Sequence, residues 1–584
     1  MGEGRSIVRS IVTGMLVGSA LSICNIYAGL KIGWSTTMGV TSALLSFAIW
    51  RMRSASAVAT SPFTILETNL AQTAASSAAA VSSAGLVAAI PALTIMTGQV
   101  LPWYQLAAWT ASVCFVGNVI AIPLRKQMLE TDPLPFPIGV ATAETLRQIY
   151  AKGGEAMARV RTLGVAALVS GGVKVLEGMK LVGPVGFPGA LGKYPLKNLT
   201  FAFDPGVLLA GIGGLMGTRA ALSVLGGSIF AYGVLGPELL DRGIVQAGPP
   251  DKPWFKPLVE WLLWPGVTMM VTASLTTLAF SWKALVRGIR GLASIQADDG
   301  SASSTTPANE QIPRSWLTRS AVLALTVGVA LQISIFGIPW WAAVVGVLLS
   351  VVLGVVAARV SGETGLTPVG AMGKITQLTI GAALPGNVAA NLMTANITGG
   401  AASQCADMMN DLKTGQELGA SPKSQWISQV AGATAGALIG SAVYLIMIPD
   451  PAKQLLTPEW PAPAVITWKT VAEVFRVGVS ALPRGTPLAV AIAAAVGIAL
   501  AILEQRVDVA TKKWLPSPSA LGLAFTVSAH QCVSMAIGAV ASLVVLRLAP
   551  AWHGRFWVVL CAGAIAGEGL VGAGLSIVQL LRAG

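Results

Sequence analysis

Long apolar segments that recur from end to end most constrain what this chain can fold into. Residues 488–503, LAVAIAAAVGIALAIL, contain no polar side chain. Only 11% of the 584 residues are charged, whereas soluble domains carry about 25%. A membrane-spanning helix needs about 20 mostly apolar residues, and barrel strands would show alternation instead. The sequence therefore predicts an all-α polytopic membrane protein.

The apolar runs number seven or eight in each half of the chain, which gives 14–16 transmembrane or re-entrant segments. Two runs do not fit one crossing. Residues 61–98 are too long and rich in serine, and residues 136–150 are too short. We expect half-helices or re-entrant hairpins there, because 65 glycines and 33 prolines favour broken helices and close helix contacts.

The net charge of +13 does not come from a basic domain, so we expect no nucleic-acid partner. The basic residues lie in short segments beside the apolar runs: Arg5, Arg9, Arg51, Arg53, Arg125, Lys126, Arg287, Arg290, Arg506, Lys512 and Lys513. This distribution is typical of the cytoplasmic loops of a cytoplasmic-membrane protein. We expect a multi-pass protein whose N-terminus is cytoplasmic.

One polar stretch, QADDGSASSTTPANEQIPRS at 296–315, interrupts the apolar rhythm and has the composition of a flexible linker. Basic residues on both sides place it in the cytoplasm. The predicted units are an N-terminal transmembrane repeat at 1–290, a flexible cytoplasmic linker at 291–314 and a C-terminal transmembrane repeat at 315–584. Because the first unit begins and ends in the cytoplasm, both units enter the membrane in the same orientation.

The two units also resemble each other in sequence. Residues 33–72 align with 340–377, and residues 203–217 and 516–530 both contain a proline-started helix. The first alignment matches four residue types: Trp34 with Trp341, Gly39 with Gly346, Pro62 with Pro368, and Gln72 with Gln377. We predict two parallel tandem repeats, with the binding site between them.

An uncharged but polar stretch at 391–406, NLMTANITGGAASQCA, is rich in Asn, Thr, Ser, Gln and Gly. Asn391, Thr394 and Thr398 share one helical face. Pro385-Gly386 and Gly399-Gly400 are expected to interrupt the helix and free backbone groups, which is tolerated only beside protein or a watery cavity. The alternative is helix packing through small residues joined by Asn and Ser. The density of polar groups favours a cavity.

Glu67 and Lys374 occupy nearly equivalent places in the two repeats. Ionisable residues inside membrane segments are costly and usually functional. We expect the two side chains to face each other, so that protonation of Glu67 would break the pair and couple a proton to a conformational change. A static structural ion pair is an equal alternative.

Other charged residues fall within apolar segments. Glu144 and Arg147 lie three apart and could simply pair with each other. Glu568 is the only acid in the last apolar segment.

Further polar residues are expected to have ordinary roles. Lys31 follows the first span, and its whole role could be to extend its ammonium group to the membrane interface. His530 is interpreted as a hydrogen-bonded core histidine rather than a proton relay. Asp407 and Asp411 border the cytoplasmic face, where they either gate the path or are merely solvated, and solvation is favoured.

Several enzyme motifs are absent from the sequence, including GxxxxGK[ST], HExxH and GxSxG. Two distant histidines cannot form the usual zinc or catalytic-triad sites. Five scattered cysteines without a CxxC pair are read as buried hydrophobes. We expect no cofactor and no resident metal, and a transporter rather than an enzyme.

Six segments in order carry a resemblance to a known family. They are NIYAGLKIGW at 25–34, SPFTILETNLAQTAASSA at 61–78, PFPIGVATAETL at 135–146, GLTPVGAMGKITQL at 365–378, NLMTANITGGAASQCADMMNDLKTG at 391–415 and AGEGLVGAG at 566–574. With these segments the chain resembles the oligopeptide transporter family, which includes the yellow-stripe-like metal-chelate transporters. The resemblance spans almost the whole chain.

The resemblance implies a proton-coupled secondary active transporter, built from two repeats, that imports small oligopeptides, peptide-like compounds or metal chelates. Its short loops look like those of a prokaryotic member, which implies the bacterial cytoplasmic membrane. The implied partners are the substrate, protons and membrane lipids, and a homo-oligomer is left open. Any metal would arrive inside the substrate, because the chain lacks a ligand set of its own.

The segments 61–85 and 367–406 would line the cavity, where broken-helix ends offer dipoles and free carbonyls to a substrate with both an amine and a carboxylate. The predicted substrate-binding residues are Glu67, Asn69, Gln72, Lys374, Gln377, Asn391, Asn396 and Gln404. The predicted proton-coupling residues are Glu67, Glu144 and Glu568.

Three other functions are alternatives to a secondary active transporter. A passive channel or facilitator for small polar solutes would need no buried ion pairs, and its flux would ignore a proton gradient. A membrane-embedded enzyme would need a nucleophile and a base that the sequence does not display. The permease of an ATP-driven system would need a coupling helix, for which 291–314 is too disordered in composition.

Overall fold

The computed structural model describes the chain except for residues 1, 34–37, 56–61, 152, 281, 283–285, 287–311, 366, 368, 479–481 and 584. In the described part, twelve helical stretches are long and apolar enough to cross a membrane. The only strands there are four two-residue pieces. The prediction of an all-α polytopic membrane protein is confirmed.

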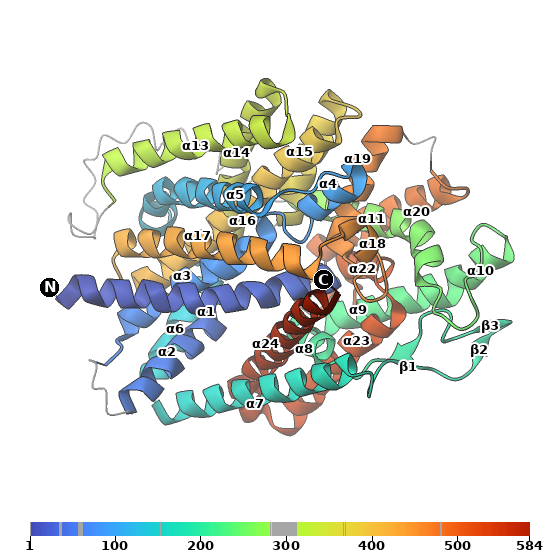
Figure 1. Cartoon of the computed structure of the whole chain (residues 1–584), viewed down its shortest axis with the longest axis horizontal. Helices are drawn as coiled ribbons and strands as arrows, with labels where there is room; N and C mark the ends of the chain where they lie inside the picture. Colours follow the sequence, from blue (N-terminus) through green and yellow to red (C-terminus); the bar gives the residue numbers. More distant parts are fainter. Residues whose placement is uncertain are drawn as a thin grey trace.

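The first half of the chain begins with a series of helices (Figure 1). They are α1 (Gly2–Ile32), α2 (Gly39–Ala55), α3 (Ile65–Ala80), η1 (Val81–Ala84), α4 (Ala89–Thr97), α5 (Trp103–Arg125), η2 (Lys126–Thr131), α6 (Pro137–Ala151) and α7 (Gly153–Gly178). Four short strands and the helices α8 to α11 complete this half: β1 (Val185–Gly186), β2 (Ala190–Leu191), β3 (Tyr194–Pro195), β4 (Ala202–Phe203), α8 (Val207–Met216), α9 (Thr218–Ser228), η3 (Ile229–Leu235), α10 (Gly236–Asp241) and α11 (Phe255–Phe280).

The second half is helical throughout its described residues. Its elements are α13 (Arg314–Phe336), α14 (Trp340–Thr364), α15 (Val369–Ala383), α16 (Val388–Leu418), α17 (Pro422–Met447), α18 (Pro451–Gln454), α19 (Pro463–Val477), α20 (Thr486–Arg506), α21 (Val509–Lys512), α22 (Pro518–Ala524), α23 (Ala529–Leu548) and α24 (Pro550–Ala583). The predicted linker at 291–314 lies almost wholly outside the described residues, as do Trp34 and Pro368 of the repeat alignment.

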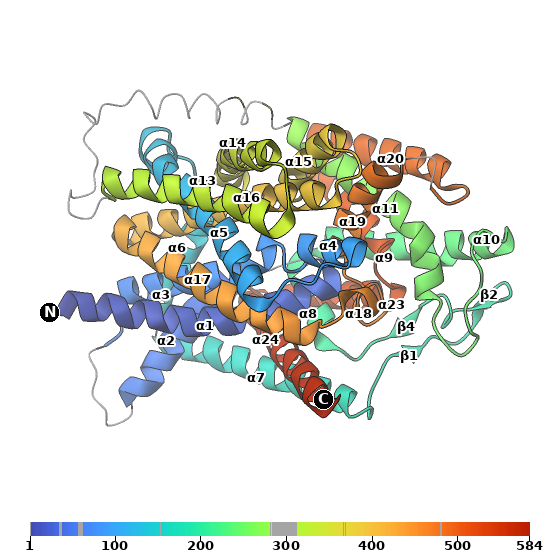
Figure 2. The ribbon, with the colours of Figure 1, turned by 45° about the horizontal axis from the view of Figure 1, so that its top comes forward.

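Helices from the two halves pack directly against one another. Figures 1 and 2 show α1 and α17 side by side, and α24 crossing close to α7. In the same way α3 packs on α17, α5 on α16 and α8 on α23. The apolar core therefore forms between the halves, and any binding site in it is built from both of them.

The segment expected to be broken at 61–98 is indeed broken. Helix α3 ends in the 3-10 turn η1, and Gly85 with φ of 115° separates this turn from α4. A side chain at Gly85 would also collide with the amide of Asn396, 2.7 Å from the position of a Cβ atom. The segment at 136–150 forms the 15-residue helix α6, too short to span a bilayer at 1.5 Å per residue.

The expected break at Gly399-Gly400 is wrong. Pro385 and Gly386, with φ of 87° at Gly386, do separate α15 from α16. However, α16 continues through both later glycines for 31 residues. At Gly400 a Cβ atom would lie 2.4 Å from Cγ1 of Val113 on α5. These glycines thus permit close packing of helices, and α16 tolerates its many polar groups because protein surrounds it.

The four short strands lie where the chain leaves α7. β1 pairs antiparallel with β4, with Val185 opposite Phe203, and β2 pairs antiparallel with β3, with Ala190 opposite Pro195. The segment is attached to α23 by Thr200, whose carbonyl oxygen accepts from the His530 N–H (3.0 Å) and whose hydroxyl accepts from the Ala529 N–H (3.0 Å). This attachment fixes the residues that lead into α8 beside the start of α23.

Candidate functional site

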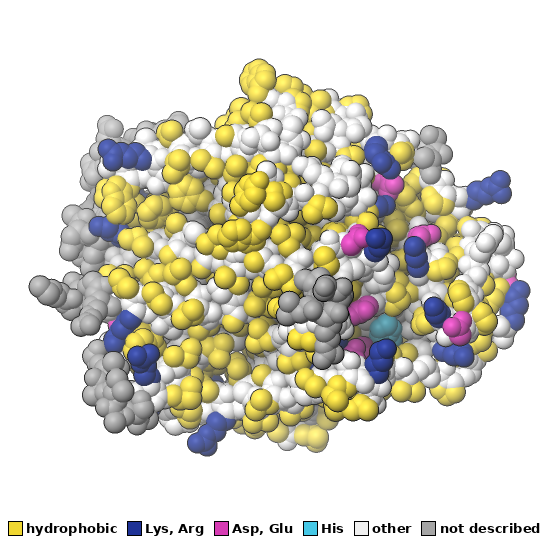
Figure 3. Space-filling view, viewed as in Figure 1, with side chains coloured by type: hydrophobic (Ala, Val, Ile, Leu, Met, Phe, Trp, Pro, Cys, Tyr) yellow, Lys and Arg dark blue, Asp and Glu magenta, His cyan; other side chains and the backbone are white. Residues whose placement is uncertain are grey.

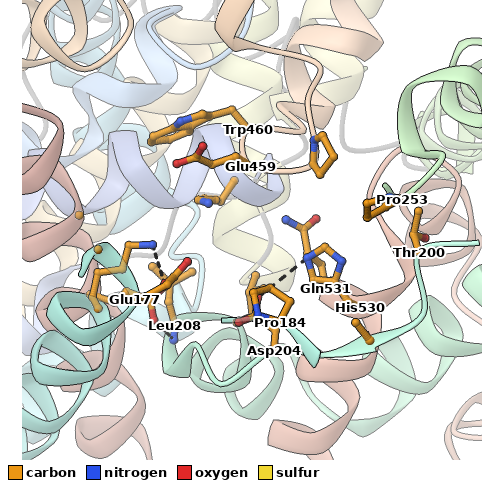
Figure 4. A pocket seen from close by; sticks show the side chains of 18 of the residues that line it. Glu177, Pro184, Thr200, Asp204, Leu208, Pro253, Glu459, Trp460, His530 and Gln531 are labelled. Carbon is orange, nitrogen blue, oxygen red and sulfur yellow. Dashed lines mark hydrogen bonds and ion pairs between the residues drawn. The ribbon is translucent and has the colours of Figure 1, made fainter. Parts of the chain in front are cut away.

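A cavity lined by described residues has a volume of about 630 Å³. It lies where α1 and α7 end and where α8 and α23 begin, and the loop after α18 covers one side. Figure 4 shows side chains from these segments pointing into it, among them Glu177, Asp204, Glu459 and His530. Space-filling Figure 3 shows acidic, basic and histidine side chains gathered on one side of an otherwise largely apolar face.

The cavity lining carries both signs of charge. Its basic residues are Lys31, Lys174, Lys180, Lys197 and Lys252, and its acidic residues are Glu177, Asp204, Asp251, Glu459 and Glu568. Some of these groups pair within the lining. Lys174 Nζ lies 2.8 Å from Glu177 Oε2, and His530 Nε2 lies 3.9 Å from Asp204 Oδ2. A lining of this kind can receive a ligand that itself carries both charges.

Lys31 is the basic residue of the cavity with the clearest capacity for a ligand. Its Nζ lies 5.1 Å from the ring centroid of Trp460 and 5.7 Å from that of Tyr27. Among the described residues no carboxylate lies within ion-pair distance of it. The expectation that Lys31 only snorkels to the interface is wrong, because the two aromatic rings hold its ammonium group at the cavity by cation–π contacts.

Glu568 supplies a buried carboxylate to the same cavity. Its side chain comes from α24 and is 6% exposed. Oε2 accepts a hydrogen bond from the backbone N–H of Leu208 (2.8 Å), in the first turn of α8. The positive end of the helix dipole favours a negative charge at this place. Of the three predicted proton-coupling residues, Glu568 is the one that lines the large cavity.

His530 and Asp204 face each other across the cavity from the two segments that align in the repeat. The Asp204 carboxylate also accepts from the Gly206 N–H (2.9 Å), which holds it at the start of α8. His530 is mostly buried, as a core histidine would be, yet its ring lines the cavity. Asp204 is not among the residues that the sequence predicts for the site. The alignment of the proline-started segments at 203–217 and 516–530 is the sequence feature that contains both Asp204 and His530.

Glu67 does not meet Lys374. Its carboxylate binds the Arg9 guanidinium, with Nε to Oε1 at 2.5 Å and Nη2 to Oε2 at 2.7 Å. It also accepts from the Thr64 N–H (2.8 Å) in a capping box that begins α3. The expected pair between the two repeats is therefore wrong, because a closer arginine on α1 takes the acid.

Lys374, Gln377 and Asn391 are brought together, as the prediction of a shared site required. Lys374 Nζ donates to Gln377 Oε1 (2.5 Å) and lies 4.5 Å from the Trp468 ring centroid. Gln377 Nε2 donates to Asn391 Oδ1 (2.9 Å), and Asn391 Nδ2 donates to the Gln377 carbonyl (2.8 Å). The three side chains are buried and none lines the 630 Å³ cavity.

The remaining predicted substrate residues are buried at helix contacts. Asn396 Oδ1 accepts from the Trp109 indole (2.8 Å), and Gln404 Nε2 donates to Ser77 Oγ (2.8 Å). Asn69 is fully buried, and neither polar atom of its amide has a hydrogen-bond partner among the described residues. Glu144, a predicted coupling residue, is exposed on α6 and its carboxylate lies 3.9 Å from Arg147.

A second cavity of about 220 Å³ lies beside α16 and is lined by Gln72, Asp407, Asn410 and Asp411, among others. Gln72 Nε2 donates to Asp411 Oδ1 (2.8 Å). Asp411 is 5% exposed. The expectation of solvation is wrong for Asp411, because α3, α6 and α17 cover this part of α16, whereas Asp407 is partly exposed.

Comparison with known proteins places the whole chain in one family. Residues 7–579 match the model of the "OPT oligopeptide transporter protein" family. A Saccharomyces cerevisiae protein provisionally named an oligopeptide transporter is 25% identical over 75% of this chain and 77% of its own length. An Oryza sativa protein provisionally named a metal-nicotianamine transporter is 26% identical over 93% and 84%. An Arabidopsis thaliana metal-nicotianamine transporter is 24% identical over 96% and 89%.

These matches agree with the cavity and with the helical architecture. They run along nearly the entire chain, and the matched proteins are transporters rather than enzymes. The chain is therefore a multi-pass membrane transporter that belongs to the OPT oligopeptide transporter protein family.

Proposed function

We propose that the protein is a proton-coupled secondary active transporter that imports small oligopeptides, peptide-like compounds or metal chelates, and that the 630 Å³ cavity is its substrate site. The observation that carries this proposal is the presence of both charge signs around one cavity. Ligand sites usually enclose about 300–1,000 Å³, so the volume suits a short peptide or a chelate of similar size.

The charged groups suggest how such a substrate would be held. The Lys31 ammonium would bind a substrate carboxylate, since no protein carboxylate in the described chain pairs with it. Asp204 and Glu568 would bind a substrate amine. Peptides and amino-carboxylate chelators carry both groups, and the names of the relatives include an oligopeptide transporter and a metal-nicotianamine transporter. A metal would enter as part of the substrate.

Of the three coupling candidates we favour Glu568. Glu67 is fixed by Arg9 and by its capping box, and Glu144 is exposed. Glu568 instead touches both the cavity and the first turn of α8, so its protonation would change the binding site and a helix contact together. The buried polar residues of α3, α15 and α16 remain proposed lining for the path in another conformation: Asn69, Gln72, Lys374, Gln377, Asn391, Asn396 and Gln404.

We also propose that the chain consists of two parallel repeats with a cytoplasmic N-terminus and linker, in a bacterial cytoplasmic membrane. The short helices that the alignment paired support the repeats. Helix α8 packs on α23, and α9 packs on α22. If α8 corresponds to α22 and α9 to α23, a two-fold axis between the units would interchange these two contacts. Basic side chains near the start of α1 support the orientation (Figure 3).

Uptake into proteoliposomes, with and without an inward proton gradient, tests the function. The substrates would be short peptides, nicotianamine, and both loaded with iron. We expect gradient-driven uptake of one class, and its loss in Glu568→Gln together with weaker binding of the substrate. Glu67→Gln and Glu144→Gln test the other coupling candidates, and Glu260→Gln, an exposed acid on α11, is the control.

Two outcomes would contradict the proposal. Uptake that ignores the proton gradient would leave a facilitator as the better account. Uptake that survives Lys31→Gln and Glu568→Gln with unchanged KM and rate would show that the large cavity is not the substrate site.

A further inference from the structure

Asp407 and Asp411 lie one helical turn apart on α16, and both line the 220 Å³ cavity. Residues four apart are neighbours on a helix surface, so two carboxylates share one small enclosed space. The cavity is not continuous in its lining with the 630 Å³ substrate cavity, since no residue lines both. The mechanism proposed above leaves this pair without a role.

No cation of the described chain compensates these two charges. Asp411 Oδ1 accepts from Gln72 Nε2 (2.8 Å). With the Gln429 amide turned so that its nitrogen faces the acid, that nitrogen lies 3.1 Å from Oδ2. Both donors are neutral amides, and Asp407 forms no ion pair with a described residue. Asp411 is buried and Asp407 is partly buried, and two such like charges without a counter-charge are costly.

Most basic groups on the elements around α16 have other partners, Arg319 on α13 is exposed, and no ion pair of the described residues joins a basic group to Asp407 or Asp411. The partners are Asp132 and Glu363 for Arg359 on α14, Gln377 for Lys374 on α15, Glu417 for Lys413 on α16 and for Arg147 on α6, Glu130 for Arg125 on α5, Glu473 for Lys469 on α19, the Trp316 ring for Lys423 on α17, and Glu67 for Arg9 beside α3. The nearest further acids, Glu67 and Glu144, would add negative charge only.

Two unpartnered oxygen atoms also face this space. Gln72 is 1% exposed and Asn410 is 6% exposed, and both line the cavity. Gln72 Oε1 and Asn410 Oδ1 accept no hydrogen bond from any described group. Buried acceptors are normally satisfied, so these two oxygen atoms point to a donor that the protein itself does not supply.

We propose that Asp407 and Asp411 together bind one proton, and that the carboxyl O–H donates to Gln72 Oε1 or Asn410 Oδ1. One bound proton removes one of the two like charges and supplies the missing donor. The balance is simple: a carboxylate plus a proton gives a carboxyl group, and no other bond changes. Carboxylate and amide oxygen atoms can hold a proton, and hard metal ions, of which sodium is the one tested below, also take oxygen ligands.

The site is placed to link proton binding to helix packing. Gln72 ties Asp411 to α3, and Gln425 on α17 donates to the Asp411 carbonyl oxygen (2.7 Å). Protonation of the carboxylate would change its hydrogen bonding with Gln72, and with it the contact between α3 and α16. As a second coupling site, this inference rests on the proposed proton-driven function, although proton binding itself does not.

Infrared difference spectroscopy of the purified full-length protein tests proton binding without any substrate. Between about pH 8 and pH 5 we expect a band from the carbonyl stretch of a buried protonated carboxyl group in the wild type. The measurement is made with Glu568→Gln as the background, because Glu568 is itself a proposed proton site. There the band should shift in Asp407→Asn or Asp411→Asn and disappear when both are replaced. Glu260→Gln should leave it unchanged.

Thermal unfolding at constant ionic strength provides a second readout and guards against misfolded variants. The Asn side chain resembles a protonated carboxyl group, so both single variants should melt at a higher temperature than the wild type near pH 8, and the difference should shrink as the pH falls. A band that persists in the double variant would overturn the proposal. So would stabilisation of the wild type, but not of the variants, by sodium in place of choline, which would assign the site to sodium. Loss of transport in Glu568→Gln bears on the proposed function alone.

Discussion

At the scale of single residues, the buried charges of this transporter divide into those that the protein pairs and those that it leaves facing a cavity. Arg9 and Glu67 form a bidentate pair at the start of α3. Lys31 and Glu568 face the 630 Å³ cavity instead. Sequence reasoning could find Glu67 and Glu568 because an acid in an apolar segment is visible in one dimension. It could not find which cation each acid meets, since Arg9 and Glu67 lie 58 residues apart.

The Arg9–Glu67 pair is expected to stabilise the fold rather than to carry substrate. Removing one partner of a buried pair costs about 3–5 kcal/mol, so Glu67→Gln should lower the melting temperature clearly. Unfolding can be followed with a thiol-reactive dye, because all five cysteines are buried. The exposed Glu260→Gln should change stability by about 0.5 kcal/mol or less. Equal stability of Glu67→Gln and wild type would contradict a structural role.

Lys31 is expected to affect affinity. A hydrogen bond to a charged group contributes about 1.5–3 kcal/mol, and 1.4 kcal/mol corresponds to about tenfold in affinity. Lys31→Gln should therefore raise KM by at least about tenfold in the uptake assay. Lys31→Arg keeps the charge and the cation–π contacts, so its KM should lie between those of the wild type and Lys31→Gln. A normal KM in Lys31→Gln would remove this residue from the site.

At the scale of elements, the apolar periodicity and the proline and glycine positions predicted the helices, the break near Gly85 and the short helix α6. The continuous α16 was not predictable in the same way. Glycine pairs such as Gly399-Gly400 are common at helix breaks, but a side chain at Gly400 would collide with Val113 on α5. Whether a glycine breaks or packs a helix depends on a partner that lies elsewhere in the chain, and the local sequence does not contain that information.

The crossing of α8 and α23 depends on glycine in a way that can be measured. At Gly538 a Cβ atom would lie 1.8 Å from the Ala210 carbonyl oxygen, so the helices must separate to accept alanine. Overpacking costs about 1–3 kcal/mol, and α8 carries the Leu208 N–H that binds Glu568. Gly538→Ala should therefore lower both stability and transport. Gly172→Ala, at an exposed glycine of α7 with open space around it, should be neutral or slightly stabilising.

At the scale of the whole molecule, the predicted class and the family were within reach of the sequence, because hydropathy and ordered motifs extend along the chain. The position of the main cavity was not. The sequence predicted the binding cavity between 61–85 and 367–406, where uncharged polar residues are dense. The structure satisfies most of those residues with one another and opens the larger cavity where α1 and α7 end and α8 and α23 begin. Polar density therefore indicated helix packing as much as binding.

The orientation of the chain is the prediction that joins these scales. If the N-terminus and the linker are cytoplasmic, the segment of short strands that borders the large cavity faces outward, where an importer must first meet its substrate. A cysteine at Lys193, in the exposed turn between β2 and β3, should react in intact cells with a membrane-impermeant thiol reagent. A cysteine at Ser303 in the linker should react only after the membrane is opened. The native cysteines are buried and should add little background. The reverse pattern would mean that the large cavity opens to the cytoplasm in this conformation. It would favour an exporter or an inward-facing state over an outward-facing importer.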